Sequence, residues 1–261
     1  MKSLTALTAL TAVIALPAVL LAQEAMVVRD NSFLIEEAYN QDAGAVQHIS
    51  TFQRTRSDVW AYGFTQEWPL GGIQHQLSWS LSLVNGGAGA GIGDGMVNYR
   101  YQLLGATGGR TSISPRISLL VPTGSSSDNR GTDAEGVQVN LPVSVDVMPR
   151  VVLHANAGST LTPSARGPGD DRAFAVDLHA GASVVYLLLP WANLMFETLW
   201  LSEAAVVAEG ETAHASTALL NPGVRFAISA GTAQLVPGIG WTIDTDGENG
   251  VFLYFSVEHP F

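Results

Sequence analysis

The sequence predicts an all-β protein, a transmembrane antiparallel β-barrel of about twelve strands with short periplasmic turns and longer extracellular loops. The chain is 47% hydrophobic and only 13% charged, whereas soluble proteins carry about 25% charged residues. Beyond its N-terminus it has no apolar run of the about 18 residues that a membrane-spanning helix needs. From about residue 44 onward, short segments with a period of two follow one another. This alternation is typical of strands with one apolar and one polar face.

The alternation is clearest in IQHQLSWSLSLV, residues 73–84, where Gln and Ser occupy one face and mostly apolar residues the other. Most segments have about ten residues or a little more, the length that a tilted strand needs to cross a bilayer. The predicted strands are 44–54, 59–69, 73–84, 95–104, 111–122, 136–148, 151–161, 173–187, 191–202, 217–228, 232–243 and 251–261.

The connections between these segments alternate in length. Short ones are predicted at 69–72, 105–109, 149–150, 189–191 and 229–231. Longer ones are predicted at 85–95, 123–136, 162–172, 202–216 and 244–250. Outer-membrane barrels show the same asymmetry, with tight turns on the periplasmic side and longer loops outside the cell.

The N-terminus indicates export. Residues 1–22 carry one Lys followed by an apolar stretch, which predicts a removed signal peptide, then a periplasmic segment 23–43 and a barrel 44–261. The net charge of −11 argues against a nucleic-acid partner. The absence of cysteine from the sequence excludes disulfides and thiolate zinc sites. We therefore expect a protein of the bacterial outer membrane.

The last strand, GVFLYFSVEHPF, ends the chain on Phe261. Chain termini usually fray, but in a closed barrel the last strand pairs with the first. A terminal Phe on an amphipathic strand also resembles the signal that the outer-membrane assembly machinery reads. The predicted partners are this machinery, outer-membrane lipid and lipopolysaccharide.

If the apolar faces look outward, charged and polar side chains line the interior. Basic residues lie on early strands and acidic ones on later strands, so opposed walls of charge would select solutes. Alternatively, these groups neutralise one another and fill the interior. The candidates for the lumen and its selectivity are Arg100, Arg116, Arg225, Asp146, Asp177, Glu197, His154 and His179.

The segment before the first strand carries a distinctive motif, NSFLIEEAYNQ followed by GAVQHI. Its candidates for gating at the periplasmic mouth are Phe33, Glu36, Glu37 and Tyr39. The motif resembles the opening of the meta-pathway phenol-degradation (Phenol MetA-pathway) family of outer-membrane β-barrel transporters. The stretches 91–103, 114–124 and 221–226 agree with that family, so the resemblance covers nearly all of the mature chain. It implies a barrel and a transporter, and it fixes no binding residues.

These patterns predict a channel for passive passage of small, aromatic or hydrophobic solutes, without enzymatic activity, cofactor or metal. One alternative is a non-conducting structural or adhesion barrel that acts through its loops. Another is a lipid hydrolase, because His48 and Ser50 have the spacing of a base and nucleophile on one strand face. A metal site at His154, Asp177 and His179 is a further option, although inward histidines more often form ordinary hydrogen bonds.

Overall fold

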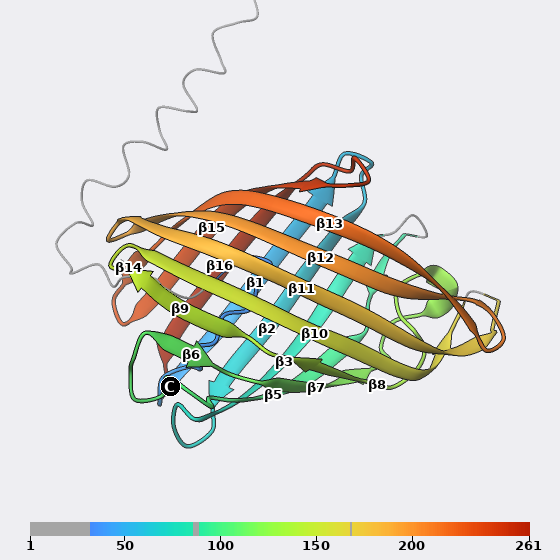
Figure 1. Ribbon diagram of the computed structural model, residues 1–261, viewed down its shortest axis with the longest axis horizontal. Helices are drawn as coiled ribbons and strands as arrows, with labels where there is room; N and C mark the ends of the chain where they lie inside the picture. Colours follow the sequence, from blue (N-terminus) through green and yellow to red (C-terminus); the bar gives the residue numbers. More distant parts are fainter. Residues whose placement is uncertain (1–31, 86–88, 168) are drawn as a thin grey trace, which may run out of the picture.

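The computed structural model describes residues 32–85, 89–167 and 169–261. Their strands form one antiparallel sheet that closes into a barrel (Figure 1). The elements are β1 (Ala45–Thr55), β2 (Trp60–Pro69), β3 (His75–Asn85), β4 (Ala90–Ile92), β5 (Gly95–Tyr101), β6 (Thr111–Ile113), β7 (Arg116–Val121), the 3₁₀ turn η2 (Ser126–Asp128), β8 (Gly136–Asn140), β9 (Val143–Met148), β10 (Val151–Arg166), β11 (Arg172–Leu189), β12 (Ala192–Ala208), β13 (Glu211–Phe226), β14 (Ile228–Ala230), β15 (Ala233–Asp244) and β16 (Gly250–Pro260).

The barrel closes where the first strand meets the last. β1 pairs with β16 along its whole length, from Ala45 opposite Pro260 to Thr55 opposite Gly250. Among the described residues, β4 continues into β5, β6 into β7, β8 into β9 and β13 into β14, so the strands make twelve passes of the wall. The predicted twelve-stranded antiparallel barrel is therefore confirmed.

Side chains alternate between the two surfaces of the wall. On β10, Leu153 and Leu161 point outward and are more than a third exposed, whereas His154 and Thr162 point inward and are buried. The same alternation on β16 puts Leu253 outside. An apolar outer surface is what a barrel needs where lipid surrounds it. Within the described chain, no helix is both long and apolar enough to cross a membrane.

Two pairs of strands extend further than the sequence predicts. β12 and β13 pair as far as Ala208 opposite Glu211, where a loop 202–216 is expected. The connection is a tight turn in which Gly210 has φ 75°, a left-handed conformation that glycine adopts readily. β10 and β11 likewise pair as far as Arg166 opposite Arg172. Where paired strands extend into water, both of their faces can carry polar residues. The end of the alternating apolar and polar pattern therefore does not mark the end of the strand.

The opposite end of the barrel carries the short connections, and we call it the short-turn end. Ala45 and Pro260 lie at this end, which is on the left in Figure 1. In outer-membrane barrels, the end with the short connections usually faces the periplasm.

The wall is interrupted at one level on two neighbouring passes. Ser114 and Pro115 separate β6 from β7, and Leu141 and Pro142 separate β8 from β9. Proline has no N–H to donate to a strand ladder. The Ser114 N–H instead bonds to the Pro142 carbonyl at 3.2 Å. The strand ladder is therefore interrupted here. Inward polar side chains at this level can form hydrogen bonds with a segment inside the barrel.

Apolar side chains also fill part of the interior. Val152, Val185, Met195 and Phe252 are buried there in one cluster with Phe33, which precedes the first strand. The sequence assigns polar groups to the interior, but it does not predict this apolar cluster. Because Val and Met recur at period two on both faces, the pattern alone does not show which face they occupy.

Candidate functional site

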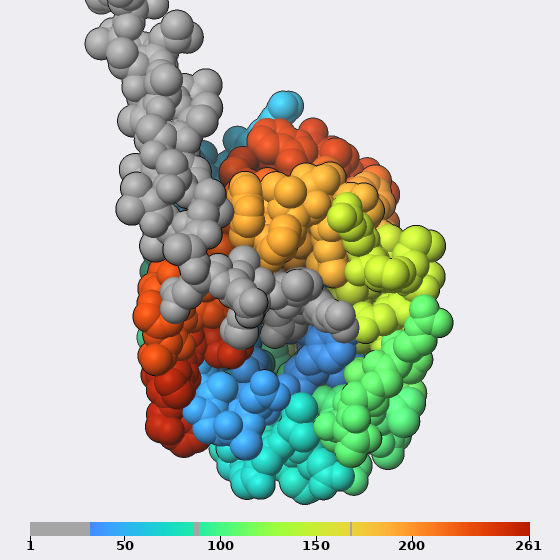
Figure 2. All heavy atoms as spheres, turned by 90° about the vertical axis from the view of Figure 1, so that its left-hand side faces the viewer, coloured from blue at the N-terminus to red at the C-terminus, as the bar shows by residue number. Residues whose placement is uncertain are grey.

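The described residues before the first strand, 32–44, run through the inside of the barrel to its short-turn end, and we call them the plug segment. Residues 32–41 are buried or half-buried, and residues 42–44 are exposed. Figure 2 looks at the short-turn end, where blue atoms from the early part of the described chain lie within the ring of strands. These residues form bends and a turn before β1 begins at Ala45. Backbone groups outside regular ladders need other partners when they are buried. Side chains of the wall supply them.

The first part of the plug segment is bound by Glu197 of β12. The backbone N–H groups of Phe33, Leu34 and Ile35 all point to its Oε1, at 2.9, 3.1 and 3.4 Å. Asn221 Nδ2 donates to the other oxygen at 2.8 Å. Successive N–H groups that converge in this way form an anion-binding concavity. The buried carboxylate is thereby satisfied, and it holds the plug segment on this side of the wall.

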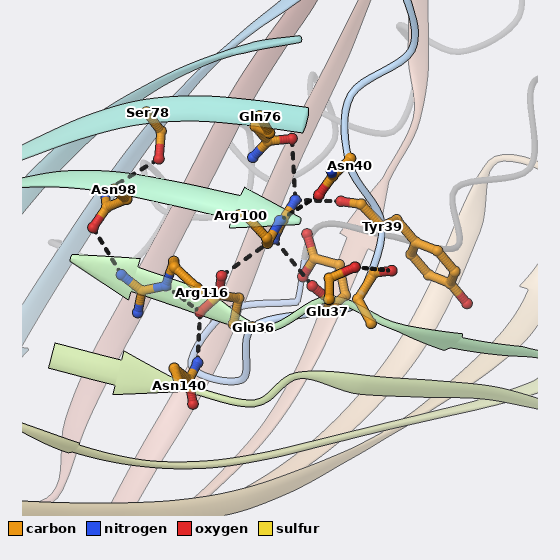
Figure 3. Close-up of polar contacts among 12 residues, drawn as sticks. Glu36, Glu37, Tyr39, Asn40, Gln76, Ser78, Asn98, Arg100, Arg116 and Asn140 are labelled. Carbon is orange, nitrogen blue, oxygen red and sulfur yellow. Dashed lines mark hydrogen bonds and ion pairs between the residues drawn. The ribbon is translucent and has the colours of Figure 1, made fainter. Parts of the chain in front are cut away.

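On the other side of the barrel, Glu36 binds to β5, β7 and β8 (Figure 3). Its Oε1 accepts from Arg100 Nη1 at 3.2 Å, and its Oε2 accepts from Arg116 Nε at 2.9 Å and from Asn140 Nδ2 at 2.6 Å. Burial by itself raises the pKa of Glu36, but Arg116 and Arg100 and the Asn140 hydrogen bond together hold it below its ordinary value. Glu36 is therefore charged in this position, and we call this contact the Glu36 latch.

The two arginines of the latch are held in place by different parts of the protein. Arg116 is held by the wall, because its Nη1 donates to Asn98 Oδ1 at 2.8 Å and its Nη2 donates to Gln138 Oε1 at 2.7 Å. Arg100 mostly binds the plug segment, since it donates to Asn40 Oδ1 at 2.8 Å and also to the backbone carbonyls of residues 37 and 39. The position of Arg116 thus does not depend on the plug segment, whereas that of Arg100 does.

The middle of the plug segment is held at the interrupted level of the wall. The Ala38 N–H donates to Ser144 Oγ at 2.8 Å, and the Ala38 carbonyl accepts from Gln102 Nε2 at 2.8 Å and from Ser114 Oγ at 3.0 Å. A step further on, the Gln41 N–H donates to Gln76 Oε1 at 2.7 Å. The wall here replaces the hydrogen bonds that a strand neighbour would make.

Phe33 packs into a recess whose walls are glycines. A Cβ added at Gly238 would lie 2.5 Å from the Phe33 ring, and one at Gly223 would lie 2.7 Å from it. The ring centroids of Phe252 and Tyr254 lie 5.6 and 5.4 Å from that of Phe33. Glycine in a strand often marks such a close approach. Without side chains at these two positions, the wall leaves room for an aromatic ring.

A cavity of about 270 Å³ borders the plug segment inside the barrel, on the side away from the short-turn end. The plug segment supplies one side of it, from Ser32 to Glu37. The remaining lining comes from the wall and includes Glu67, Arg100 and Arg116. The lumen therefore ends on the plug segment, and the latch is accessible from the cavity.

The remaining candidates from the sequence lie at separate places on the inner wall. His154 Nδ1 is 2.7 Å from Ser144 Oγ, and its ring meets that of Tyr39 edge-on. His179 Nε2 is 3.0 Å from Asn140 Oδ1. Asp177 accepts from the backbone N–H of residue 204 at 2.8 Å, where the ladder between β11 and β12 has ended.

Arg225 is completely buried on β13, and Asp146 lies on β9 near the short turns. The structure therefore brings Arg100 and Arg116 together on one carboxylate, and Glu197 binds the backbone of the same segment. Arg100, Arg116 and Glu197 thus contact the plug segment, whereas Asp177 contacts the backbone of β12. His154, Asp177 and His179 each contact a different partner.

His48 and Ser50 point away from the lumen. Their neighbour Gln47 points inward, where its side-chain oxygen accepts from Gln41 at 2.6 Å. On the outside, His48 Nε2 is 3.1 Å from His259 Nε2, and Ser50 Oγ is 3.2 Å from the Tyr62 hydroxyl. The two residues are thus engaged with other partners, whereas a base and nucleophile would bond to each other. This arrangement does not support a catalytic pair at His48 and Ser50.

Comparison with known proteins supports the fold. No protein-family model and no curated protein matches the chain. An outer membrane channel from Pseudomonas putida F1 aligns with a TM-score of 0.65 and 14% identity, over 86% of this chain and 98% of that one. The NanC porin aligns with a TM-score of 0.54 at 8% identity, over 83% and 100% of the two chains. The KdgM porin gives 0.53 at 10% identity, over 82% and 99%. The chain thus has the fold of small outer-membrane channels.

Several residues of the site are not among the sequence candidates. The glycines at 223 and 238, the serines at 114 and 144, and Gln76 and Gln41 all contact the plug segment or position it. The one signal for the glycines is their place inside predicted strands, where glycine weakens packing. Nothing in the local pattern connects the serines or Gln76 to residues 32–44.

Proposed function

We propose that this protein is a bacterial outer-membrane channel for the passive passage of small solutes, and that the plug segment gates it. The observation that carries the proposal is a cavity of about 270 Å³ that ends on residues 32–37. This is slightly below the about 300–1,000 Å³ of typical ligand pockets, so the size suits a small solute. Passage to the short-turn end would require the plug segment to move.

The interactions of the plug segment favour a gate over a permanent wall. It forms no strand of the barrel, and side-chain hydrogen bonds, one ion-pair cluster and Phe33 hold it in place. Such contacts break one by one, unlike a strand ladder that is paired on both sides. The channel fold of the comparison structures agrees with this role.

The solutes that we propose are small and aromatic or hydrophobic in part. The recess that Phe33 fills is also lined by Phe252 and Tyr254, and aromatic rings stack on such surfaces. The sequence resemblance to the meta-pathway phenol-degradation transporters implies a transporter and leaves the solute open, so the proposed solute class rests on this aromatic lining.

The two ends of the chain agree with export and insertion into the outer membrane. The predicted signal peptide 1–22 lies outside the described residues. Phe261 is 73% exposed, and its N–H donates to the Gly44 carbonyl at 3.0 Å, so the last strand is fixed up to its final residue. This geometry suits recognition by the assembly machinery, with lipid and lipopolysaccharide around the barrel.

The test is single-channel recording in planar bilayers from the refolded mature protein and from a variant that lacks residues 23–43. We expect small, infrequent current steps from the full protein and larger steps from the shortened one. Asp42→Asn, an exposed position of the same segment, serves as the control and should match the full protein. Correct folding is checked by heat-modifiable migration on gels.

A second candidate function is a sealed barrel that acts through its loops, and the observation that favours it is that the cavity ends on residues 32–37. In that case the shortened variant would fold but would carry no current. Such a result would contradict the channel and would direct attention to the long connection that contains η2.

A further inference from the structure

The wall side of the Glu36 latch has the features of an anion site that exists without the plug segment. Arg116 is oriented by Asn98, Ser118 and Gln138, all residues of the wall. Asn140 is oriented by His179, whose Nε2 lies 3.0 Å from its Oδ1, so that its Nδ2 donates into the site. Donors fixed in advance bind an anion at little cost of reorganisation.

The geometry of these donors suits a carboxylate. One oxygen of Glu36 accepts from Arg116 Nε at 2.9 Å and Asn140 Nδ2 at 2.6 Å, and the other accepts from Arg100 Nη1 at 3.2 Å. Both oxygens of one planar group are therefore used. Arginine is favoured wherever planar carboxylates are recognised through charge-assisted hydrogen bonds.

The plug segment changes the charge of the cavity lining. The charged residues that the wall contributes to this lining are Arg100, Arg116 and Glu67, and the plug segment adds Glu36 and Glu37. When the plug segment leaves, two positive groups face one negative group, and the wall has one net positive charge to be balanced. A monoanion restores the balance, and a cation worsens it.

We propose that the Glu36 carboxylate occupies the place of a solute carboxylate, so that the channel takes small monocarboxylic acids in their anionic form. This inference rests on the proposed function and names its substrate class. The solute enters the cavity from the loop side, competes with Glu36 for Arg116 and Asn140, and so releases the latch. Because a flexibly tethered group acts at an effective concentration of the order of mM, a solute of equal affinity must reach about that concentration to open the gate.

The probes are benzoate and benzamide, which share a ring and differ in charge. Binding of each radiolabelled compound is measured by equilibrium dialysis in detergent, and currents are recorded in bilayers. The proteins are the full mature chain, Glu36→Gln, Glu36→Gln with Arg116→Gln, and Asp42→Asn. Asp42 is exposed in the same plug segment, so its variant matches the charge change without touching the latch.

We expect Glu36→Gln to bind benzoate about tenfold more tightly than the full protein, because the tethered competitor is gone. Arg116→Gln in that background should weaken binding again by about tenfold, since one charge-assisted hydrogen bond of about 1.4 kcal/mol is lost. Benzamide should not distinguish these proteins. In a potassium chloride gradient, the reversal potential of Glu36→Gln should shift towards anion selectivity, and that of Asp42→Asn should not.

Two other outcomes separate this inference from the channel itself. If Glu36→Gln conducts but binds benzoate and benzamide equally, the channel stands and the carboxylate class is wrong. If benzoate binds in an Arg116-dependent way but no variant conducts, the anion site stands, and both the channel and the passage of carboxylates through it are refuted. Inorganic phosphate that competes as well as benzoate would also overturn the assignment to carboxylates.

Discussion

Arg100 and Arg116 lie directly opposite each other on β5 and β7, and both guanidinium groups bind the same carboxylate. Like charges at directly opposite positions of a sheet destabilise it. Glu36 relieves this repulsion from a segment that is not part of the sheet. The plug segment therefore takes part in the charge balance of the wall, and its contacts give four predictions.

The first prediction concerns the charge of the latch. Glu36→Gln keeps the size of the side chain but loses the attraction to two guanidinium groups. Hydrogen bonds to charged groups contribute about 1.5–3 kcal/mol, so the displaced state of the plug segment should rise at least about tenfold in population. Single-channel recording should show a higher open probability. An open probability equal to that of Asp42→Asn would contradict a gating role for Glu36.

The second prediction concerns pH. The pKa of Glu36 lies below its ordinary value in the docked plug segment, so docking is stabilised above that ordinary value and weakens as pH falls through the docked pKa. The charged groups that face Glu36 in the latch are Arg100 and Arg116, and Glu37 and Glu67 also lie close to it. The current should therefore rise as pH falls below about 4.5, the ordinary value. Glu36→Gln retains the other carboxylates, so a rise of equal size in that variant would assign the effect elsewhere.

The third prediction concerns the recess for Phe33. A Cβ at Gly238 would lie 2.5 Å from the Phe33 ring, so Gly238→Ala should expel the ring. Overpacking of this kind costs about 1–3 kcal/mol, here at the expense of plug docking. Phe33→Ala removes the clash, and the double variant should behave like Phe33→Ala alone in recordings of open probability. If Gly238→Ala has the same effect with and without Phe33, the glycine acts on the wall and not on the ring.

The fourth prediction concerns Glu197. Its replacement by Gln removes the negative charge on which the N–H groups of Phe33, Leu34 and Ile35 converge. The start of the plug segment should then open more often. Because the sequence contains no cysteine, Ser32→Cys gives a single thiol at a buried position.

The measurement is the rate at which a water-soluble thiosulfonate labels that cysteine. We expect Glu197→Gln to raise the rate at least about tenfold, in line with about 1.5 kcal/mol for a charged hydrogen bond. Glu203→Gln, an exposed position on the same strand, is the matched control. Equal rates in both variants would show that Glu197 does not hold the plug segment.

The sequence predicts the barrel well because lipid and the lumen impose opposite demands on alternate residues. Leu253 and Phe255 of β16 are outward as expected, and the polar Asn98, Gln138 and Asn140 face inward. Strand ends are less well predicted where β12 and β13 continue into water, because there neither face has to be apolar.

The site is predicted in part. Glu36 and Phe33 stand out because their segment is more elaborate than a spacer, and Arg100 and Arg116 stand out as inward charges. Their contact could not be predicted, because period two gives the face of a residue and not its depth or its partner. The recess at Gly238 depends on how β13, β15 and β16 pack around one ring. Such close approach is a property of the assembled wall and not of any one strand.

The contacts of the plug segment also fix the order in which the protein is completed. Phe33 bonds to a side chain 164 residues later in the chain, and Glu36 bonds to residues on three different strands. Contacts of such long range form late, because the ends of a long loop must first come together. Residues 32–44 precede every strand of the barrel in the chain, yet they find their partners only once β12 has joined the sheet. A docked plug segment is therefore a mark that the barrel has been assembled.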